Sequence, residues 1–282
     1  MNVFHIVRVL STTLTLLLTL VQSQVEPKAH DPLLLSELGA KTNNLRASVE
    51  LEPLILGGTI VPSKTKLYTA SLRRTKSGKS FCGGSLITPT HVLTAAHCLP
   101  GKIQYVSVGS HFAQGTEDGE QLQVIQATRH PRYRDGSHAY DFMVLELEQA
   151  SSFAPVALAK ADESDMTYAE RGTVMGWGAM AEGGFSSPEL LRVDVPLMNA
   201  TECAKVLDID HSMLCAGGDK NIDSCQGDSG GPLILEEPFE DVLIGVVSWG
   251  EGCGRPGSPG VYAKVSIVTE WLAKVAPGVQ FR

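Results

Sequence analysis

The sequence predicts a globular, all-β fold with one helix near the C-terminus, and one observation supports each part of that prediction. After Ile55, short apolar and β-branched runs alternate with turns rich in Gly, Pro, Asn and Asp, which is typical of many short strands in a barrel or sandwich. One segment near the C-terminus carries apolar residues at helical spacing. With 43% hydrophobic and 19% charged residues, the chain has the composition of a globular protein.

The expected strands follow one another along the chain, each bounded by turn residues. A helix is expected over Ile267–Val275, where apolar positions recur at three and four residues. The strand runs are Ser85–Ile87, His91–Thr94, Tyr105–Val108 and Leu122–Ile125, and later Gly172–Met175, Pro232–Leu235 and Val242–Val247.

The N-terminal residues predict a secretory signal peptide. Arg8 supplies a positive charge ahead of the apolar run Val9–Val21, which is short for a membrane span. We expect cleavage after Ser23, so that residues 1–23 are removed, with an uncleaved membrane anchor as the alternative. Residues 24–54 are interpreted as a pro-segment or, alternatively, as a tail without function, and residues 55–282 as the folded domain. The protein is therefore expected to be secreted and extracellular, with no membrane contact after signal cleavage.

Net charge and cysteine content indicate which partners and which cross-links to expect. The formal net charge is −8 and no Lys/Arg run stands out, so nothing favours nucleic acid. An even number of cysteines in a secreted chain favours disulfides, although six cysteines allow fifteen pairings. The cysteines are dispersed and no CxxC pair is present, which argues against a metal site built from them.

Three short motifs carry the candidate chemistry. A serine hydroxyl attacks poorly unless an adjacent base removes its proton. An imidazole can take and return that proton near neutral pH, and a carboxylate can hold the imidazole in the right tautomer. The chain supplies all three groups: His97 within Thr94–Cys98, Asp141 within Tyr140–Leu145, and Ser229 within Asp223–Pro232.

These motifs, in the order histidine, aspartate, serine, resemble those of the trypsin/chymotrypsin family of serine endopeptidases, from about Ile55 to the C-terminus. The resemblance implies two antiparallel six-stranded β-barrels with the active site in the cleft between them and a C-terminal helix. His97 and Asp141 would come from the first barrel and Ser229 from the second. The implied reaction is hydrolysis of peptide bonds through an acyl-enzyme intermediate, with Ser248 beside the aspartate.

The resemblance also assigns a substrate pocket. Asp223 would lie at its base and select Arg or Lys before the scissile bond, because an apolar side chain would leave a buried carboxylate unpaired. The backbone N–H groups of Gly227 and Ser229 would form the oxyanion hole. The implied partners are protein or peptide substrates with Arg or Lys before the cut, and protein protease inhibitors; no cofactor is implied. The remaining pocket residues would be Ser224, Ser248, Trp249, Gly250 and Gly260.

Activation is where the sequence departs from the family pattern. Ile55-Leu56-Gly57-Gly58 resembles the mature N-terminus, whose freed ammonium would pair with Asp228 and order the pocket. Leu54 stands where the family has Arg or Lys, so a trypsin-like activator should not cut there efficiently. Ser80 replaces a histidine that helps to keep the precursor inactive. The mode of activation, and the need for it, are therefore open.

The remaining expectations are smaller. Asn199 begins an N-glycosylation sequon in a secreted chain, with an unused site as the alternative. Glu117 and Glu120 resemble part of a calcium loop, but Ser110 replaces a carboxylate, and we expect no metal. The resemblance selects one disulfide pairing: Cys82 with Cys98, Cys203 with Cys215, and Cys225 with Cys253.

A rival interpretation comes from the same family. Some members of similar appearance, secreted by water moulds, inhibit plant glucanases, and the Phe81–Ile87 and Tyr105–Gly109 stretches look like that group. Such proteins typically lose a member of the triad, whereas this chain keeps all three, which favours the endopeptidase. The alternative is a non-catalytic protein that binds and inhibits a secreted host enzyme such as a glucanase; fold alone does not decide between them. A purely structural protein would explain neither Asp223 nor the triad.

Overall fold

The computed structural model describes residues 57–164, 166 and 171–282. The predicted signal peptide (residues 1–23), the predicted pro-segment (residues 24–54) and Ile55 lie outside the described residues. Among the described residues, no helix combines the length and the apolar character needed to cross a membrane.

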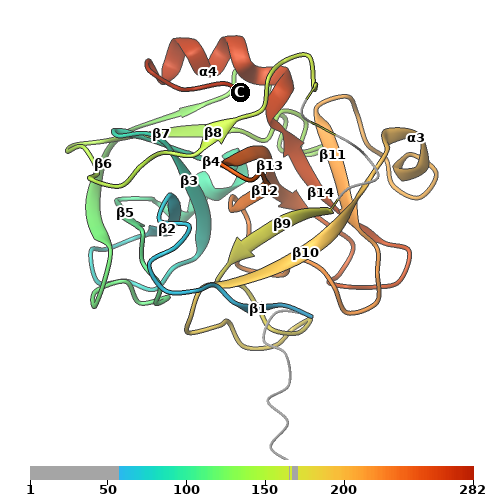
Figure 1. The fold of residues 1–282 in the computed structure, drawn as a ribbon, viewed down its shortest axis with the longest axis horizontal. Helices are drawn as coiled ribbons and strands as arrows, with labels where there is room; N and C mark the ends of the chain where they lie inside the picture. Colours follow the sequence, from blue (N-terminus) through green and yellow to red (C-terminus); the bar gives the residue numbers. More distant parts are fainter. Residues whose placement is uncertain (1–56, 165, 167–170) are drawn as a thin grey trace, which may run out of the picture. The chain divides into compact units, whose positions relative to one another are not determined.

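The first half of the domain is a closed antiparallel barrel of six strands (Figure 1). Its neighbours run in the order β2-β3-β4-β7-β6-β5. Leu72, Leu86, Leu93 and Val106 point into its core and are fully buried. The strands are β2 (Thr69–Arg73), β3 (Cys82–Thr88), β4 (His91–Thr94), β5 (Tyr105–Val108), β6 (Glu120–Arg129) and β7 (Met143–Leu147).

The second half forms another six-stranded antiparallel barrel, because β9 pairs with both β10 and β12 and so closes the path β10-β11-β14-β13-β12. Two short strands are added outside this ring: β1 (Thr59–Ile60) pairs with β10, and β8 (Ala157–Leu158) runs parallel to β13. The ring strands are β9 (Arg171–Gly176), β10 (Leu191–Met198), β11 (Met213–Gly217), β12 (Pro232–Glu236), β13 (Asp241–Trp249) and β14 (Pro259–Lys264).

Helices are few and short in the described chain. The 3-10 helix η1 (Ala96–Gly101) follows β4, and α3 (Ala200–Cys203) follows β10. At the C-terminus, the 3-10 helix η2 (Val265–Val268) continues into α4 (Thr269–Val275). Leu272 of α4 is fully buried, and the Trp271 ring meets the imidazole of His130, which follows β6 of the first barrel, edge to face. The C-terminal helix therefore leaves the second barrel and packs against the first.

The predicted fold class is confirmed, and each of the seven predicted strand runs lies within a strand of the structure. His91–Thr94 and Tyr105–Val108 coincide with β4 and β5. The helix predicted over Ile267–Val275 is present, but its first turn is of the 3-10 type. Strands β2, β7, β10, β11 and β14 were not predicted. Pro196 interrupts the apolar run of β10, and the pairing of all five strands depends on distant neighbours.

Each of the three disulfides lies within one half of the domain, and backbone hydrogen bonds join the two halves. The disulfides join Cys82 to Cys98, Cys203 to Cys215 and Cys225 to Cys253, which are the pairs that the resemblance predicts. The N–H of Gly83 on β3 donates a hydrogen bond of 2.7 Å to the carbonyl oxygen of Ser229, which lies just before β12. This contact fixes Ser229 of the second barrel against a strand of the first.

Candidate active site

His97 and Asp141 meet because β4 and β7 are antiparallel neighbours. Thr94, at the end of β4, pairs with Met143, at the start of β7. The residue three positions after Thr94 and the residue two positions before Met143 therefore emerge at the same end of the barrel. There His97 is the second residue of η1, and Asp141 lies in the loop that enters β7.

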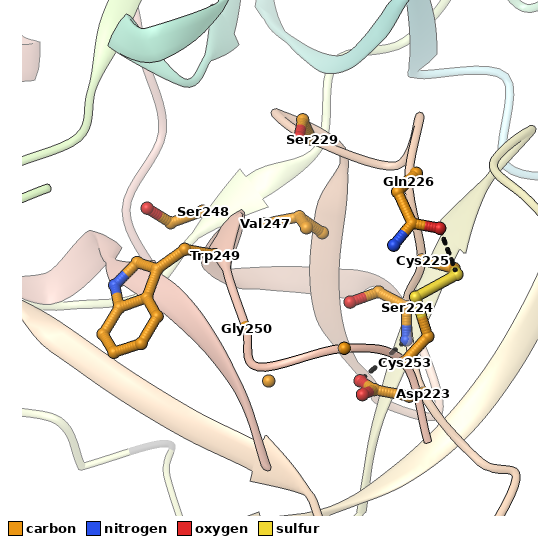
Figure 2. A pocket seen from close by; sticks show the side chains of 12 residues that line it. Asp223, Ser224, Cys225, Gln226, Ser229, Val247, Ser248, Trp249, Gly250 and Cys253 are labelled. Carbon is orange, nitrogen blue, oxygen red and sulfur yellow. Dashed lines mark hydrogen bonds between the residues drawn. A yellow bond between two sulfur atoms is a disulfide. The ribbon is translucent and has the colours of Figure 1, made fainter. Parts of the chain in front are cut away.

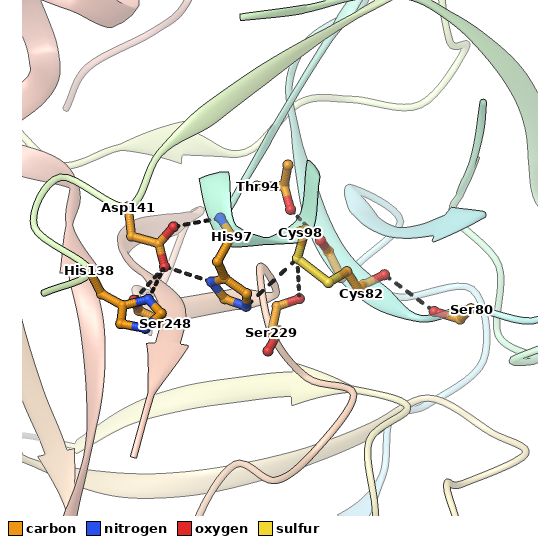
Figure 3. Close-up of a disulfide and its surroundings, with 10 residues drawn as sticks. Ser80, Cys82, Thr94, His97, Cys98, His138, Asp141, Ser229 and Ser248 are labelled. Carbon is orange, nitrogen blue, oxygen red and sulfur yellow. Dashed lines mark hydrogen bonds and ion pairs between the residues drawn. A yellow bond between two sulfur atoms is a disulfide. The ribbon is translucent and has the colours of Figure 1, made fainter. Parts of the chain in front are cut away.

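The Asp141 carboxylate is completely buried and surrounded by donors (Figure 3). Its Oδ1 accepts the backbone N–H of His97 at 2.9 Å, and its Oδ2 lies 2.7 Å from His97 Nδ1. Ser248, at the end of β13 in the second barrel, donates its hydroxyl to the same Oδ2 at 2.5 Å. Burial by itself would raise the pKa of Asp141, but the nearby imidazoles of His138 and His97 and the hydroxyl of Ser248 outweigh it and hold the pKa well below its usual value.

Ser229 lies beside this network without joining it. In the described part of the chain its Oγ makes no hydrogen bond to His97 or to any other group, while its carbonyl oxygen is held by Gly83. The free nitrogen of His97, Nε2, lies 3.9 Å from the disulfide sulfur of Cys98. The structure thus brings His97, Asp141 and Ser248 into contact and places Ser229 near them (Figure 3). Serine–histidine contacts in unliganded proteases are often long and tighten when a substrate binds.

The residues expected to form an oxyanion hole have the required backbone. Gly227 adopts φ +103°, and a Cβ there would lie 3.1 Å from the Cα of Gly178, so a larger residue would be both strained and crowded. Within the described residues, neither the N–H of Gly227 nor that of Ser229 donates a hydrogen bond to protein. Both donors are therefore available to an oxygen that develops negative charge.

A pocket of about 140 Å³ opens next to Ser229 (Figure 2). Asp223 lines it and is only 3% exposed, and its carboxylate accepts the N–H groups of Ser224 at 2.8 Å and Gly254 at 3.0 Å. Burial raises the pKa of Asp223 to about 6, because two backbone donors only partly offset the loss of water. A cationic side chain entering this pocket would supply the missing counter-charge.

The other predicted pocket residues also line this cavity. A Cβ on Gly260 would lie 3.0 Å from the Asp223 carboxylate and 3.2 Å from the hydroxyl of Tyr262, so a side chain there would press on the charged base. The Ser224 hydroxyl lies 3.5 Å from the Tyr262 hydroxyl, a neighbour that the sequence did not bring to attention. Ser224, Ser248, Trp249, Gly250 and Gly260 all line the pocket.

Asp228 is a second buried carboxylate on the same loop, and it is 1% exposed. Its oxygens accept the N–H groups of Gly178 at 2.8 Å and Cys225 at 2.9 Å. No cation pairs with it among residues 57–164, 166 and 171–282. Burial raises the pKa of Asp228 to about 6, so the charged form lacks a compensating group in the described chain.

Three further side chains, one beside the site and two elsewhere in the domain, bear on the sequence-based expectations. The sequence left His138 unassigned, but its Nδ1 lies 3.7 Å from Asp141 Oδ2. Its position three residues before the aspartate is the sequence feature that could have indicated this contact. Asn199 is exposed and accepts the N–H of Glu202 as the N-cap of α3, which leaves its amide nitrogen unbonded. The Glu120 carboxylate accepts hydrogen bonds from Ser151 and Ser152.

Comparisons with known proteins give two kinds of relative. The family model described as Trypsin matches residues 55–272. The chain is 46% identical over 230 residues to glucanase inhibitor protein 2 of Phytophthora infestans, which covers 80% of this chain and 90% of that relative. A protein of the same name from Phytophthora sojae is 45% identical over 225 residues, or 78% of each chain. A trypsin of Saccharopolyspora erythraea is 38% identical over 218 residues, or 75% of this chain and 93% of the relative.

Proposed function

The chain belongs to the trypsin family, and from that premise we propose that it is a secreted protein that binds and inhibits a glucanase. The observation that carries the proposal is the 46% identity with a glucanase inhibitor of P. infestans over most of both chains. Six further glucanase inhibitors, from P. infestans and P. sojae, are 42% to 45% identical to it. The three disulfides favour an oxidising, extracellular location.

An exposed aromatic surface next to the cleft supports binding of a protein. A hollow of about 590 Å³ is lined by Phe112, Trp177, Phe185 and Gly227, so it borders the predicted oxyanion hole. Phe185 is 89% exposed and Phe112 37% exposed. Exposed aromatic clusters are enriched at protein interfaces and dominate their binding energy. Inhibition by such a surface needs no working nucleophile.

The test is to titrate a panel of secreted plant glucanases with the purified protein and to measure remaining glucanase activity. We expect inhibition that saturates at a fixed stoichiometry and is unchanged in Ser229→Ala. Phe185→Ser should weaken it, whereas Phe239→Ser, which changes a 93% exposed phenylalanine on the β12–β13 hairpin, should not. Folded protein that binds none of the glucanases would overturn the proposal.

The second candidate function is a serine endopeptidase that cuts after Arg or Lys. Two observations favour it: the intact hydrogen-bond network around Asp141, and the uncompensated Asp223 carboxylate in the pocket. In this chemistry His97 would take the Ser229 proton while the oxyanion hole stabilises the tetrahedral intermediate. The implied ligands are then basic peptide segments of proteins.

Peptidase activity is tested independently of glucanase binding, on the same preparation. An organophosphate should label Ser229, peptide substrates should be cut after Arg and Lys, and benzamidine-type cations should compete. Asp223→Ser should sharply reduce cleavage after basic residues while labelling persists. Homogeneous, correctly processed protein that shows neither labelling nor turnover would exclude this candidate and leave the glucanase proposal untouched.

The maturation steps also belong to this proposal. Signal cleavage after Ser23 and a later cut between Leu54 and Ile55, by a protease that accepts leucine, would free an ammonium to pair with Asp228. The burial of Asp228 and the raised pKa of its carboxyl support a need for that cation. Mass spectrometry of the secreted protein's N-terminus tests both cuts. Full peptidase activity of an uncut Leu54→Pro chain would defeat the activation step.

A further inference from the structure

One cation of the first barrel is buried without a carboxylate partner. Arg73 ends β2 and is one of the largest side chains that are completely buried. Among the described residues it forms no ion pair. Taking a guanidinium out of water is costly, and an apolar side chain of similar size would fill the same space at lower cost. The charge at this position therefore needs a reason beyond packing.

The guanidinium of Arg73 joins two loops through their backbone. Its Nη1 donates to the carbonyl oxygen of Gly78 at 2.7 Å and to that of Gln114, and its Nη2 donates to the carbonyl oxygen of Ala113 at 2.8 Å. Gly78 belongs to the β2–β3 loop (residues 74–81), and the other two residues belong to the β5–β6 loop (residues 109–119). The fixed, planar fork of an arginine is suited to bridging several acceptors in this way.

The β5–β6 loop is folded closely around this guanidinium. Gly115 adopts φ +50°, and a Cβ at that position would overlap Arg73 Nη2. The Ser107 hydroxyl donates to the carbonyl oxygen of Gly115 at 3.3 Å, and the Arg73 Nε donates to the Ser71 hydroxyl at 3.2 Å. A residue larger than glycine could not keep the loop in this contact.

The same two loops supply the first-barrel part of the aromatic hollow that borders the predicted oxyanion hole. Ala113 and Gln114 line the hollow, although their carbonyl oxygens are bound by Arg73. The second barrel contributes Phe185 and Gly227, among others. The first-barrel residues that line the hollow are Lys79 and Ser80 from the β2–β3 loop, and Phe112, Ala113, Gln114 and Glu117 from the β5–β6 loop.

Ala113 connects this part of the hollow to the second half of the domain. Its carbonyl oxygen accepts from Arg73, and its N–H donates to the carbonyl oxygen of Pro188 at 2.8 Å. The preceding residue, Phe112, forms an isolated antiparallel bridge with Glu189. The placement of the Phe112 ring therefore depends on the hydrogen bonds of Arg73 as well as on the contact with the second half.

We propose that Arg73 is a positioning residue for partner binding, which holds the two loops together so that Phe112 and Phe185 present one surface to the glucanase. The inference rests on the proposed inhibition of a glucanase. In the described chain the hydrogen bonds of Arg73 reach no member of the triad and no residue of the Asp223 pocket. Loops that must be ordered again on binding reduce affinity, because that ordering costs conformational entropy.

The experiment compares Arg73→Met with the parent protein, using a glucanase that the parent inhibits. Methionine fills a similar space but has no donors, and we expect Kd to rise at least about tenfold. Arg74→Met is the matched control, because it removes the exposed neighbouring guanidinium, which donates instead to Gly101; it should bind as the parent does. Arg73→Lys should lie between the two, because an ammonium cannot span the same carbonyls.

A double-mutant cycle tests whether Arg73 acts through the hollow. Arg73→Met should cost much less affinity when Phe112→Ser has already removed the aromatic ring, because the ring is what Arg73 positions. In a Phe239→Ser background the cost should be unchanged, whereas a general loss of structure would lower affinity equally in both backgrounds. Amide hydrogen exchange of Arg73→Met should accelerate in the β2–β3 and β5–β6 loops, with the strands of both barrels as protected as in the parent.

Equal Kd values for the parent and Arg73→Met, or losses that simply add to those of Phe112→Ser, would overturn the inference. If Arg73→Met does not fold, Arg73→Lys takes its place in the same cycle. A parent protein that inhibits no glucanase would instead overturn the proposed function. The hydrogen exchange then decides the positioning role by itself: faster exchange of the two loops supports it, and unchanged exchange excludes it.

Discussion

The two sides of the cleft satisfy their buried carboxylates in different ways. On the histidine side, Asp141 is surrounded by side-chain donors from both barrels, and its pKa lies well below its usual value. On the serine side, Asp223 and Asp228 have backbone N–H donors, and burial raises the pKa of each to about 6. All three are nearly or completely buried, so the difference comes from their partners.

The serine side of the cleft depends on a cation that the described chain does not supply, whereas the histidine side does not. On the histidine side, neighbouring side chains already stabilise the charge of Asp141. The serine side carries two carboxylates that lack a cation in the described chain, and a buried charge without a partner is costly. A basic ligand side chain at Asp223 and a freed amine at Asp228 would each supply one. We therefore expect ligands and processing to change the serine side more than the histidine side.

Breaking the histidine side should have the largest effect, and it should be seen in catalysis. Asp141→Asn would present an amide N–H to His97 and favour the wrong tautomer, as in the asparagine variant of this family's triad, where turnover falls by about four orders of magnitude. The kcat/KM of any cleavage after Arg or Lys should fall by a similar factor, while inhibition of a glucanase persists. The control is Asp135→Asn, an exposed carboxylate on the same loop. Unchanged kcat/KM in Asp141→Asn would remove the aspartate from the mechanism.

The lack of a cation beside the buried carboxylates of the serine side should be seen in the pH dependence of stability. The pKa of Asp228 is raised in the folded state, so between about pH 4 and pH 6 the folded chain holds a proton that the unfolded chain has lost. The free energy of unfolding of the uncut chain should therefore fall as pH rises through this window and then level off, and Asp228 alone should contribute about 3 kcal/mol of that fall.

Urea denaturation from pH 3.5 to 7.5 measures this dependence, and Asp228→Asn is the comparison. The variant should lack the part of the decline that Asp228 causes but keep the part due to Asp223, whose pKa is also raised. Chain cut before Ile55 should resemble the variant, because the ammonium stabilises the charged carboxylate. Identical pH profiles of the uncut parent and Asp228→Asn would contradict the buried, unpaired carboxylate.

A smaller effect is expected at the hydrogen bond between Ser248 and Asp141, which links the two barrels on the histidine side. Ser248→Ala removes a hydrogen bond to a buried charge and should lower the free energy of unfolding by about 2 kcal/mol. Ser85→Ala is the matched control, because the Ser85 hydroxyl is also buried but has no hydrogen-bond partner in the described residues; its removal should be neutral or stabilising. Equal losses in the two variants would show that packing, and not the hydrogen bond, is being measured.

The smallest effect concerns a residue outside both halves of the site. Asn199→Ala should destabilise the protein by about 1 kcal/mol, because the asparagine caps α3. Asn199→Asp keeps the cap and Thr201→Ala keeps the asparagine, yet both destroy the sequon. Expressed in a glycosylating host, both should lose any mobility shift on gels without a comparable loss of stability. A shift that survives Thr201→Ala would place the modification elsewhere.

The candidate residues themselves were predictable because the signals around them are local. His97, Asp141 and Ser229 each lie in a short motif, and Gly227 adopts a positive φ that its residue type allows at little cost. The family resemblance, carried by the same motifs, was sufficient for the two barrels and the cysteine pairs. A strand such as β14, which begins Pro-Gly, has no comparable local signal and forms because β11 and β13 flank it.

The sequence by itself determined which chemical groups are present, and the tertiary structure decided which of them contact a buried carboxylate. Ser248 is 107 positions from Asp141, and only the closing of two barrels brings its hydroxyl onto that carboxylate. The same closure leaves Asp223 and Asp228 with backbone donors alone and places His138 against Asp141 with an unsatisfied nitrogen. The physical reason is that desolvation and hydrogen bonding act over a few ångströms in space, and strand register, not sequence separation, sets those distances.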